Sequence, residues 1–191
     1  MQDDIKKLDE ISKGCLLLAD PSIINDPYFN RAIVIITEKN QNEIVGFIIN
    51  KPLEFNLDDL FKGLGKDLGV YNGGPVNKEN LYYIHNVPEL ISNSLEISKN
   101  LFWGGDFLDV KNCIKERKLG INNIRFFSGY SGWTLNQLNN EIKEKAWVIT
   151  TNRLDDKILE SNSSEFWKEE IKMLGDEYII WSNAPENPNL N

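Results

Sequence analysis

The sequence predicts an α+β protein with a mainly antiparallel sheet, and three observations lead to this class. The first is a pair of β-branched strands joined by a short polar loop, which favours a hairpin because a parallel crossover needs a dozen or more residues. The second is that amphipathic helical patterns lie among the strands and become more frequent late in the chain. The third is the dominance of local hairpins, which argues against a doubly wound sheet.

Length and composition predict a single domain over residues 1–191, with an ordered core from about 14 to 181 and a looser carboxy-terminal tail. A hydrophobic content of 41% and an aromatic content of 10% are typical of ordered globular proteins. The formal charge of -8 argues against general nucleic-acid binding, since phosphate contacts depend on clustered Lys and Arg.

The sequence shows neither a secretory signal nor a membrane span. No basic region followed by an apolar core stands at the amino terminus, and no apolar run approaches the roughly 20 residues of a spanning helix. Cys15 and Cys113 lie far apart and belong to no CxxC pattern, which is typical of buried thiols in an intracellular chain. We therefore expect a soluble cytoplasmic protein with no membrane partner.

The first third of the chain contains three predicted strands. Residues 3–12 show the pattern of a short amphipathic helix that ends at Gly14. The short apolar run at 15–19 predicts a strand that is buried on both faces. Residues 32–37 and 44–49 form the predicted hairpin, which Asn-Lys-Pro stops.

The middle third alternates short strands with two capped helices. In order, we expect a short helix capped by Asn56 and running to Phe61, a strand that enters a turn over 70–76, a strand at 81–85, a short strand near 95–97 and a helix capped by Asp106 that stops at Gly120.

The most informative run extends from Arg125 to Trp147 and predicts a strand, a glycine turn, a capped helix and a second strand. Gly129 and Gly132 stand where the backbone needs positive φ or close approach. Thr134 and Gln137 have the spacing of a capping box. Beyond this run we expect helices near 154–160 and 162–174, then an apolar segment at 178–181 and a loose end.

The only histidine, His85, is the first candidate for chemistry, because imidazole titrates near neutral pH and serves readily as a general base. The alternative is a strand-end histidine that is satisfied by a hydrogen bond, and we take this as the default. No catalytic residue is assigned on this basis.

Three polar residues at strand edges form the second candidate. Arg31 and Asp26 can pair across a short loop as a structural bridge, which is the default interpretation, and Asn50 ends the next strand. Alternatively, these residues line a pocket rim that recognises an anionic group. Trp133, like the other tryptophans, is more typical of a core or interface anchor than of a base-stacking platform.

The glycine motifs and metal ligands give weaker signals. Gly73-Gly74-Pro75 predicts a turn, since it lacks the spacing and Lys of a phosphate-binding loop. A nucleophile elbow around Ser131 is excluded, because the position that requires glycine holds Trp133. One histidine and two distant cysteines do not supply a zinc site, so we expect no metal and no cofactor.

Five runs in order resemble the YqgE/AlgH family of bacterial proteins, and together they cover roughly residues 14 to 175. They are Leu16-Leu17-Leu18-Ala19-Asp20-Pro21, Asp26-Pro27-Tyr28-Phe29-Asn30-Arg31, Gly46-Phe47-Ile48-Ile49-Asn50-Lys51-Pro52, Gly73-Gly74-Pro75-Val76 with Ile84-His85, and Gly129-Tyr130-Ser131-Gly132-Trp133 with Gln137-Leu138, Glu141-Ile142 and Ala146-Trp147.

The resemblance implies an α+β fold whose antiparallel sheet is strongly bent into a partial barrel, with helices packed outside. It implies no enzymatic activity, and the label of transcriptional regulator that some members carry comes with no DNA-binding motif in this chain. We expect a non-catalytic binding or regulatory protein that acts through an unknown protein or small molecule. The alternatives are an enzyme with a site near His85, Arg31 and Asn50, and a direct DNA-binding regulator.

Overall fold

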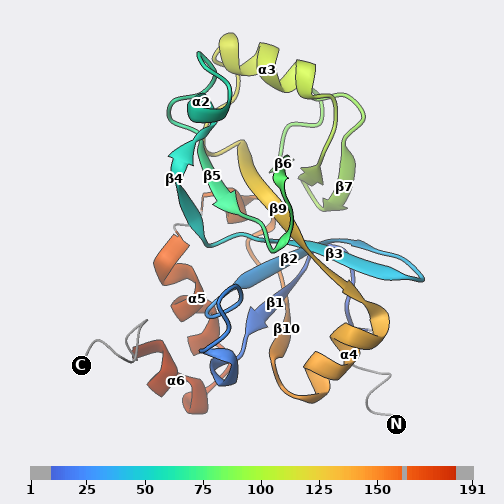
Figure 1. Ribbon diagram of the computed structural model, residues 1–191, viewed down its shortest axis with the longest axis vertical. Helices are drawn as coiled ribbons and strands as arrows, with labels where there is room; N and C mark the ends of the chain where they lie inside the picture. Colours follow the sequence, from blue (N-terminus) through green and yellow to red (C-terminus); the bar gives the residue numbers. More distant parts are fainter. Residues whose placement is uncertain (1–9, 161–162, 184–191) are drawn as a thin grey trace.

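The computed structural model describes residues 10–160 and 163–183, and it shows a strongly curled antiparallel half-barrel with helices outside it (Figure 1). The order in the sheet is β10-β1-β2-β3-β9-β6-β8-β7, with β4 and β5 attached beside β9. This arrangement confirms the predicted α+β class and the bent sheet.

The strands are β1 (Cys15–Ala19), β2 (Ile33–Lys39), β3 (Glu43–Ile48), β4 (Pro52–Asn56), β5 (Gly69–Asn72), β6 (Val76–His85), β7 (Leu95–Ser98), β8 (Leu101–Trp103), β9 (Ile124–Thr134) and β10 (Trp147–Thr151). The helices are η1 (Pro21–Ile23), α2 (Leu57–Leu60), α3 (Phe107–Lys115), α4 (Leu135–Lys143), η2 (Asp155–Leu159), α5 (Ser163–Lys172) and α6 (Asp176–Asn183).

The apolar run of β1 is buried on both faces, as predicted, because helices cover both sides of the sheet at this strand. Leu16 and Leu18 face a cluster that includes Trp167 of α5, which we call the α5 core. Leu17 and Ala19 face the opposite cluster, the α4 core, which includes Trp133 and the apolar stripe of α4. The alternation of side chains along a strand thus divides one run between two cores.

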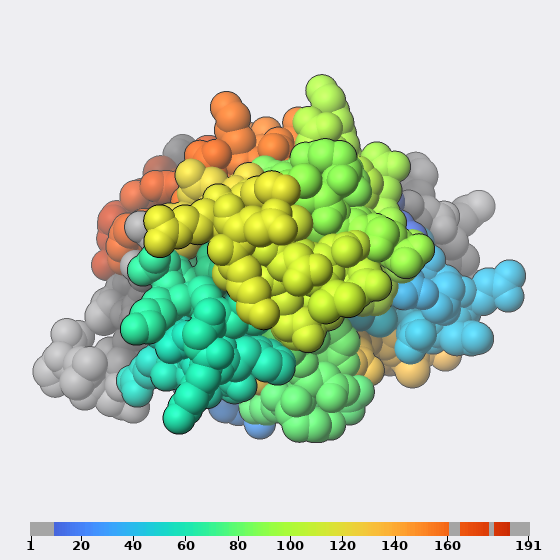
Figure 2. All heavy atoms as spheres, turned by 90° about the horizontal axis from the view of Figure 1, so that it is seen from above, coloured from blue at the N-terminus to red at the C-terminus, as the bar shows by residue number. Residues whose placement is uncertain are grey.

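The third cluster, the α3 core, lies between α3 and the strands β5, β6 and β9. These elements form the upper half of the molecule as drawn in Figure 1. Seen from above, α3 and the segment after it lie over this half, with α2 and its loop beside them (Figure 2). Asn56 and Asp106 cap α2 and α3 as predicted, each accepting a bond from a backbone N–H of the first turn. Gly120 does not end α3, which stops at Lys115.

β9 joins the two halves, since it pairs with β5 and β6 at one end and with β3 at the other. The predicted glycine turn is wrong, because the strand continues through Gly129 and Gly132 to Thr134. Gly129 has φ 71°, while Gly132 does not have positive φ and would place a Cβ 3.0 Å from the Tyr130 ring. The positive φ at Gly129 coincides with a shift in the β6–β9 register, so the strand kinks without ending.

Other boundaries also differ from the sequence expectations. Pro52 opens strand β4, where the sequence predicts only a stop, which is possible because proline is tolerated as the first residue of a strand. The apolar segment at 178–181 belongs to helix α6. The helix predicted near 154–160 is the 3₁₀ helix η2. The helix predicted at 3–12 falls largely on residues 1–9, which lie outside those described.

None of the helices within the described ranges is long and apolar enough to cross a membrane.

Candidate functional site

His85 is fully buried and fills a structural position. Its Nε2 lies 3.2 Å from the carbonyl of Gly104, and its Nδ1 accepts the backbone N–H of Val87 at 3.3 Å. These bonds fit a neutral ring that carries its proton on Nε2. Burial lowers the pKa of His85 to about 4, so the imidazole is neutral at physiological pH. The default interpretation of a satisfied strand-end histidine is therefore confirmed.

Asn50 links the ends of two neighbouring strands. Its side-chain oxygen accepts the N–H of Ile33 at 2.8 Å, and its amide donates to the carbonyl of Arg31 at 2.8 Å. Arg31 has φ 54°, in the left-handed region that costs a non-glycine residue about 1 kcal/mol. The amide of Asn50 thus fixes the strained backbone that leads into β2.

Asp26 and Arg31 each have partners of their own. The Asp26 Oδ1 accepts the N–H groups of Tyr28 and Phe29 at 2.8 and 2.7 Å, which closes the turn before β2. The guanidinium of Arg31 lies 5.2 Å from the ring of Trp167 on α5. Among the described residues, no hydrogen bond joins His85 to Asp26, Arg31 or Asn50.

Trp133 anchors a polar and aromatic cluster beneath α4. The carboxylate oxygen Oε2 of Glu141 accepts the indole N–H of Trp133 at 2.9 Å and that of Trp147 at 2.8 Å. The other oxygen accepts the side-chain amide of Gln137 at 2.9 Å. Phe29 packs against both indoles, with ring centroids 5.8 and 5.1 Å apart. Gln137 therefore serves this cluster, while its own N–H completes the cap on Thr134.

The Gly73-Gly74-Pro75 segment forms the joint between β5, β6 and β9. A Cβ on Gly73 would lie 2.2 Å from the carbonyl of Gly129, and one on Gly74 would lie 2.3 Å from Tyr130. Ser131 donates its hydroxyl to the carbonyl of Gly73 at 3.0 Å. These close approaches require glycine, so the segment is an architectural turn, as predicted.

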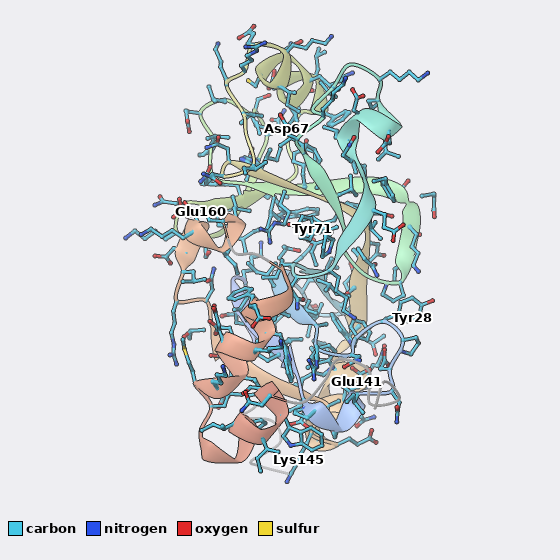
Figure 3. All side chains as sticks on the ribbon, turned by 90° about the vertical axis from the view of Figure 1, so that its left-hand side faces the viewer. Tyr28, Asp67, Tyr71, Glu141, Lys145 and Glu160 are labelled. Atoms are coloured by element: carbon cyan, nitrogen blue, oxygen red, sulfur yellow. The ribbon has the colours of Figure 1, made fainter. Side chains whose placement is uncertain are left out.

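A hollow of about 650 Å³ lies along β10, and we call it the β10 groove. Its lining comes from β10, from η1 and from the ends of α4 and α6, with Glu10 at its rim. Figure 3 shows Lys145, one of its residues, at the lower end of the molecule, the end that holds α4 and α6 in Figure 1. Trp147 belongs both to this lining and to the Glu141 cluster, so the cluster fixes one wall of the groove.

Polar groups at the groove are ordered by local bonds. Asp20 caps η1 by accepting the N–H of Ser22 at 2.8 Å, and it accepts the hydroxyl of Tyr178 at 3.4 Å. Ser22 in turn donates to the carbonyl of Lys145 at 3.4 Å. Trp181 of α6 is 42% exposed at this hollow. The groove therefore combines apolar and aromatic walls with the carboxylates of Asp20 and Glu10 and one ammonium group.

Further hollows lie in the upper half, and one of about 550 Å³ lies between the end of α3 and the loop that follows α2. An apolar notch of about 390 Å³ is lined by aromatic residues such as Phe61, Tyr82 and Trp103. A cavity of about 170 Å³ contains Arg125, whose guanidinium donates to the carbonyls of Ile49 and Leu159 at 2.8 and 2.6 Å. Within the part of the chain that the structure describes, no group of three or more potential ligands could hold a metal ion.

The β10 groove was not predicted from the sequence. Its residues come from four separate segments, and only the fold brings them together. One signal was present, because residues 147–151 contain no charged residue and no proline. Natural edge strands usually carry charged residues or proline, which prevent pairing with another strand.

Comparisons with known proteins agree on one family. A family model described as AlgH-like matches residues 16–179. A UPF0301 protein of Parabacteroides distasonis is 34% identical over 94% of this chain and 91% of its own length. A UPF0301 protein of Chlorobaculum tepidum is 31% identical over 95% and 96%.

Two solved structures share the fold. The crystal structure of protein DIP2367 from Corynebacterium diphtheriae aligns with a TM-score of 0.73 at 16% identity, covering 91% of this chain and 93% of that one. The solution structure of the AlgH protein from Pseudomonas aeruginosa aligns with a TM-score of 0.68 at 24% identity, covering 91% and 94%.

Proposed function

This chain belongs to the AlgH-like family, and we propose that it is a non-catalytic binding protein of the cytoplasm whose ligand occupies the β10 groove. The observation that carries the proposal is the groove itself, a hollow of about 650 Å³ with aromatic and charged groups on walls of regular secondary structure. Ligand sites are typically concave, with apolar or aromatic walls and placed polar groups. The groove is concave and has aromatic walls, and its lining is about as polar as it is apolar.

The enzyme alternative has little support from the geometry. Its base, His85, is buried at the end of β6 and uses both ring nitrogens in bonds to the backbone. Asn50 and Asp26 likewise direct their side chains to backbone groups. Acid–base catalysis requires a group within hydrogen-bond reach of a substrate proton. His85 and Asn50 are buried, and Asp26 is engaged in the turn before β2.

A crosslinking experiment in cells tests the proposal without knowledge of the ligand. Lys145 is exposed at the groove, so a photoreactive benzoylphenylalanine in its place should form an adduct with the bound ligand. The matched control carries the same group in place of Lys118, whose side chain is 56% exposed after α3. We expect an adduct of defined mass at the first position and none at the second.

A second variant ties that adduct to the groove. Ser22 is exposed at the rim, and Ser22→Trp places a bulky ring in the hollow without removing a buried group. The adduct should then disappear. Persistence of the adduct in the Ser22→Trp chain, or no adduct at all in the Lys145 variant, contradicts the proposal.

A further inference from the structure

The two edges of the sheet differ in how well they are protected. At one edge, β7 has four residues, carries Glu96 and has a register shift against β8. At the other edge, β10 pairs with β1 over all five residues without a shift and carries no charge and no proline. Proteins blunt exposed edges with short strands, charges, proline and bulges. By this criterion β7 is protected, whereas β10 is open to pairing.

The register shows which backbone groups of β10 face outward. The N–H of Asp20 donates to the carbonyl of Ala146, so this pair is of the hydrogen-bonded kind. Bonded and non-bonded pairs alternate in an antiparallel ladder. Val148 and Thr150 therefore bond to β1, while Trp147 and Ile149 direct their N–H and C=O groups away from it.

Hydrogen bonds on the other side of β1 support this assignment of inward-facing and outward-facing backbone groups. The N–H of Ala19, the partner of Trp147, donates to the carbonyl of Ala32 near β2. The carbonyl of Ala19 accepts the indole N–H of Trp167. Ala19 thus directs its backbone away from β10, as required when Trp147 directs its backbone into the groove.

The two sides of the edge offer different surroundings to a paired strand. On one side Val148 belongs to the α5 core, and Tyr178 and Trp181 of α6 stand beside it. On the other side Ile149 belongs to the α4 core, to which Ile11 also contributes. Glu10, the neighbour of Ile11 in the sequence, is part of the groove lining. Alternate side chains of a bound strand would meet the aromatic wall, where Asp20 lies beside Tyr178, and the α4-core side in turn.

We propose that the β10 groove binds an extended segment of a basic protein partner, which pairs with the outward backbone groups of Trp147 and Ile149 as an added strand. Charge supports this class of occupant, since Glu10 and Asp20 outnumber Lys145 at the groove and the chain carries -8 overall. A second copy of this chain would bring the same net negative charge to the contact. The proposal rests on the proposed function and specifies the ligand of the same groove.

Backbone amide exchange tests the pairing directly. Random unstructured peptides are displayed on phage and selected on the immobilised full chain, and the recovered peptides are added to the free protein. We expect exchange of the Ile149 amide to slow about tenfold or more, because it gains a hydrogen bond. The amide of Thr150 is the internal control, since it is already bonded to β1. Binding with no added protection at Ile149 overturns strand addition.

Peptide affinities of two variants at position 149 also test whether the Ile149 N–H bonds the added strand. Ile149→Pro removes the outward N–H, while Ile149→Ala trims the side chain to the same extent or more and keeps the donor. The selected peptides should bind the proline variant about tenfold more weakly than the alanine variant, the value of one lost hydrogen bond. Equal affinities overturn the proposal. If the proline variant does not fold, amide exchange in the native chain decides.

Charge and source are tested with the same peptides. The selected sequences should be rich in Lys and Arg, and Glu10→Gln should weaken their binding about twofold to fivefold, whereas the exposed Glu144 outside the groove should tolerate Glu144→Gln. Acidic or uncharged selections overturn the basic partner. If the protein sediments as a dimer, and the Ile149 amide is protected without peptide, a second copy of the chain occupies the edge. This result also overturns the basic partner.

The two proposals fail differently. A crosslinked adduct with the mass of a metabolite at Lys145 would keep the groove as a binding site and exclude the protein strand. If the Lys145 variant formed no adduct, both the binding function of the groove and the added strand would be contradicted.

Discussion

Arg125 and Glu141 are charged side chains held against opposite ends of β9, and both bond to neutral groups. Arg125 is 5% exposed and donates to the carbonyls of Ile49 and Leu159. Glu141 accepts the indole N–H groups of Trp133 and Trp147. Carbonyl dipoles stabilise the cation and N–H dipoles stabilise the anion. An enclosed charge is therefore tolerated when hydrogen-bonding dipoles replace its hydration.

The two sites differ in the length of chain that they close. The bonds of Arg125 connect residues 76 and 34 positions away, one directly after β3 and one in η2. The bonds of Glu141 connect residues eight and six positions away, within the β9–α4–β10 unit. The first site thus joins segments that are distant in the sequence, and the second fixes one local unit and the wall of the β10 groove. Figure 3 places Tyr71, which packs under the guanidinium of Arg125, near mid-height and Glu141 lower.

Arg125→Met should have the largest effect on stability. The change leaves the carbonyls of Ile49 and Leu159 without their guanidinium donor and removes the contact with Tyr71 at 4.5 Å. Each orphaned buried acceptor costs about 1–3 kcal/mol, so we expect a loss of about 4 kcal/mol in the free energy of unfolding. Urea denaturation followed by circular dichroism measures it. Arg125→Lys, which keeps the charge and some donors, should lose about half as much.

Arg125 would not differ from Glu141 if Arg125→Met destabilised only the segments next to its own cavity. A long-range clamp predicts that all probes of unfolding shift together, since the connected segments belong to different parts of the domain. Separate transitions for the α3 half and for the β1–β2 region would show instead that Arg125 stabilises only its own cavity.

Glu141→Ala should destabilise less and more locally. Two indole N–H groups and the amide of Gln137 lose their acceptor, which we expect to cost about 2 kcal/mol because α4 can open toward water. Amide exchange should accelerate in α4 and β10 and stay unchanged in α3. Glu141→Gln keeps an acceptor oxygen and is the matched control, with a cost of about 1 kcal/mol. If amide exchange accelerated uniformly through the whole sheet, Glu141 would stabilise the fold over the same range as Arg125.

The local site was partly predictable from sequence, and the long-range one was not. The spacing of Thr134 and Gln137 predicted the start of α4, and the bracketing tryptophans marked the unit, because local periodicity and caps involve neighbours in sequence. The role of Arg125 depends on carbonyls that only the folded sheet brings near it. The continuation of β9 through Gly129 also depended on tertiary contacts with Gly73 and Gly74. The open edge of β10 likewise required the strand order.

His85 offers a third solution for an enclosed ionisable group, which is to remain neutral, and its effect should be the smallest near neutral pH. Burial holds its pKa at about 4, below the value of 6.5 in the unfolded chain. Between these values the unfolded state binds a proton that the folded state does not. Stability is therefore fully present above pH 6.5 and decreases toward pH 4, by at most about 1.4 kcal/mol per pH unit.

Because His85 is the only histidine, NMR of its ring carbons reports this titration without overlap. We expect an apparent pKa near 4 in the folded protein, and a smaller loss of stability between pH 6.5 and 5.5 in a His85→Gln chain than in the native one. The glutamine variant removes the titrating group and keeps an amide for the Gly104 carbonyl. A ring that titrates near 6.5 would mean that imidazolium is accommodated at this position, and dipoles would then stabilise His85 as they stabilise Arg125 and Glu141.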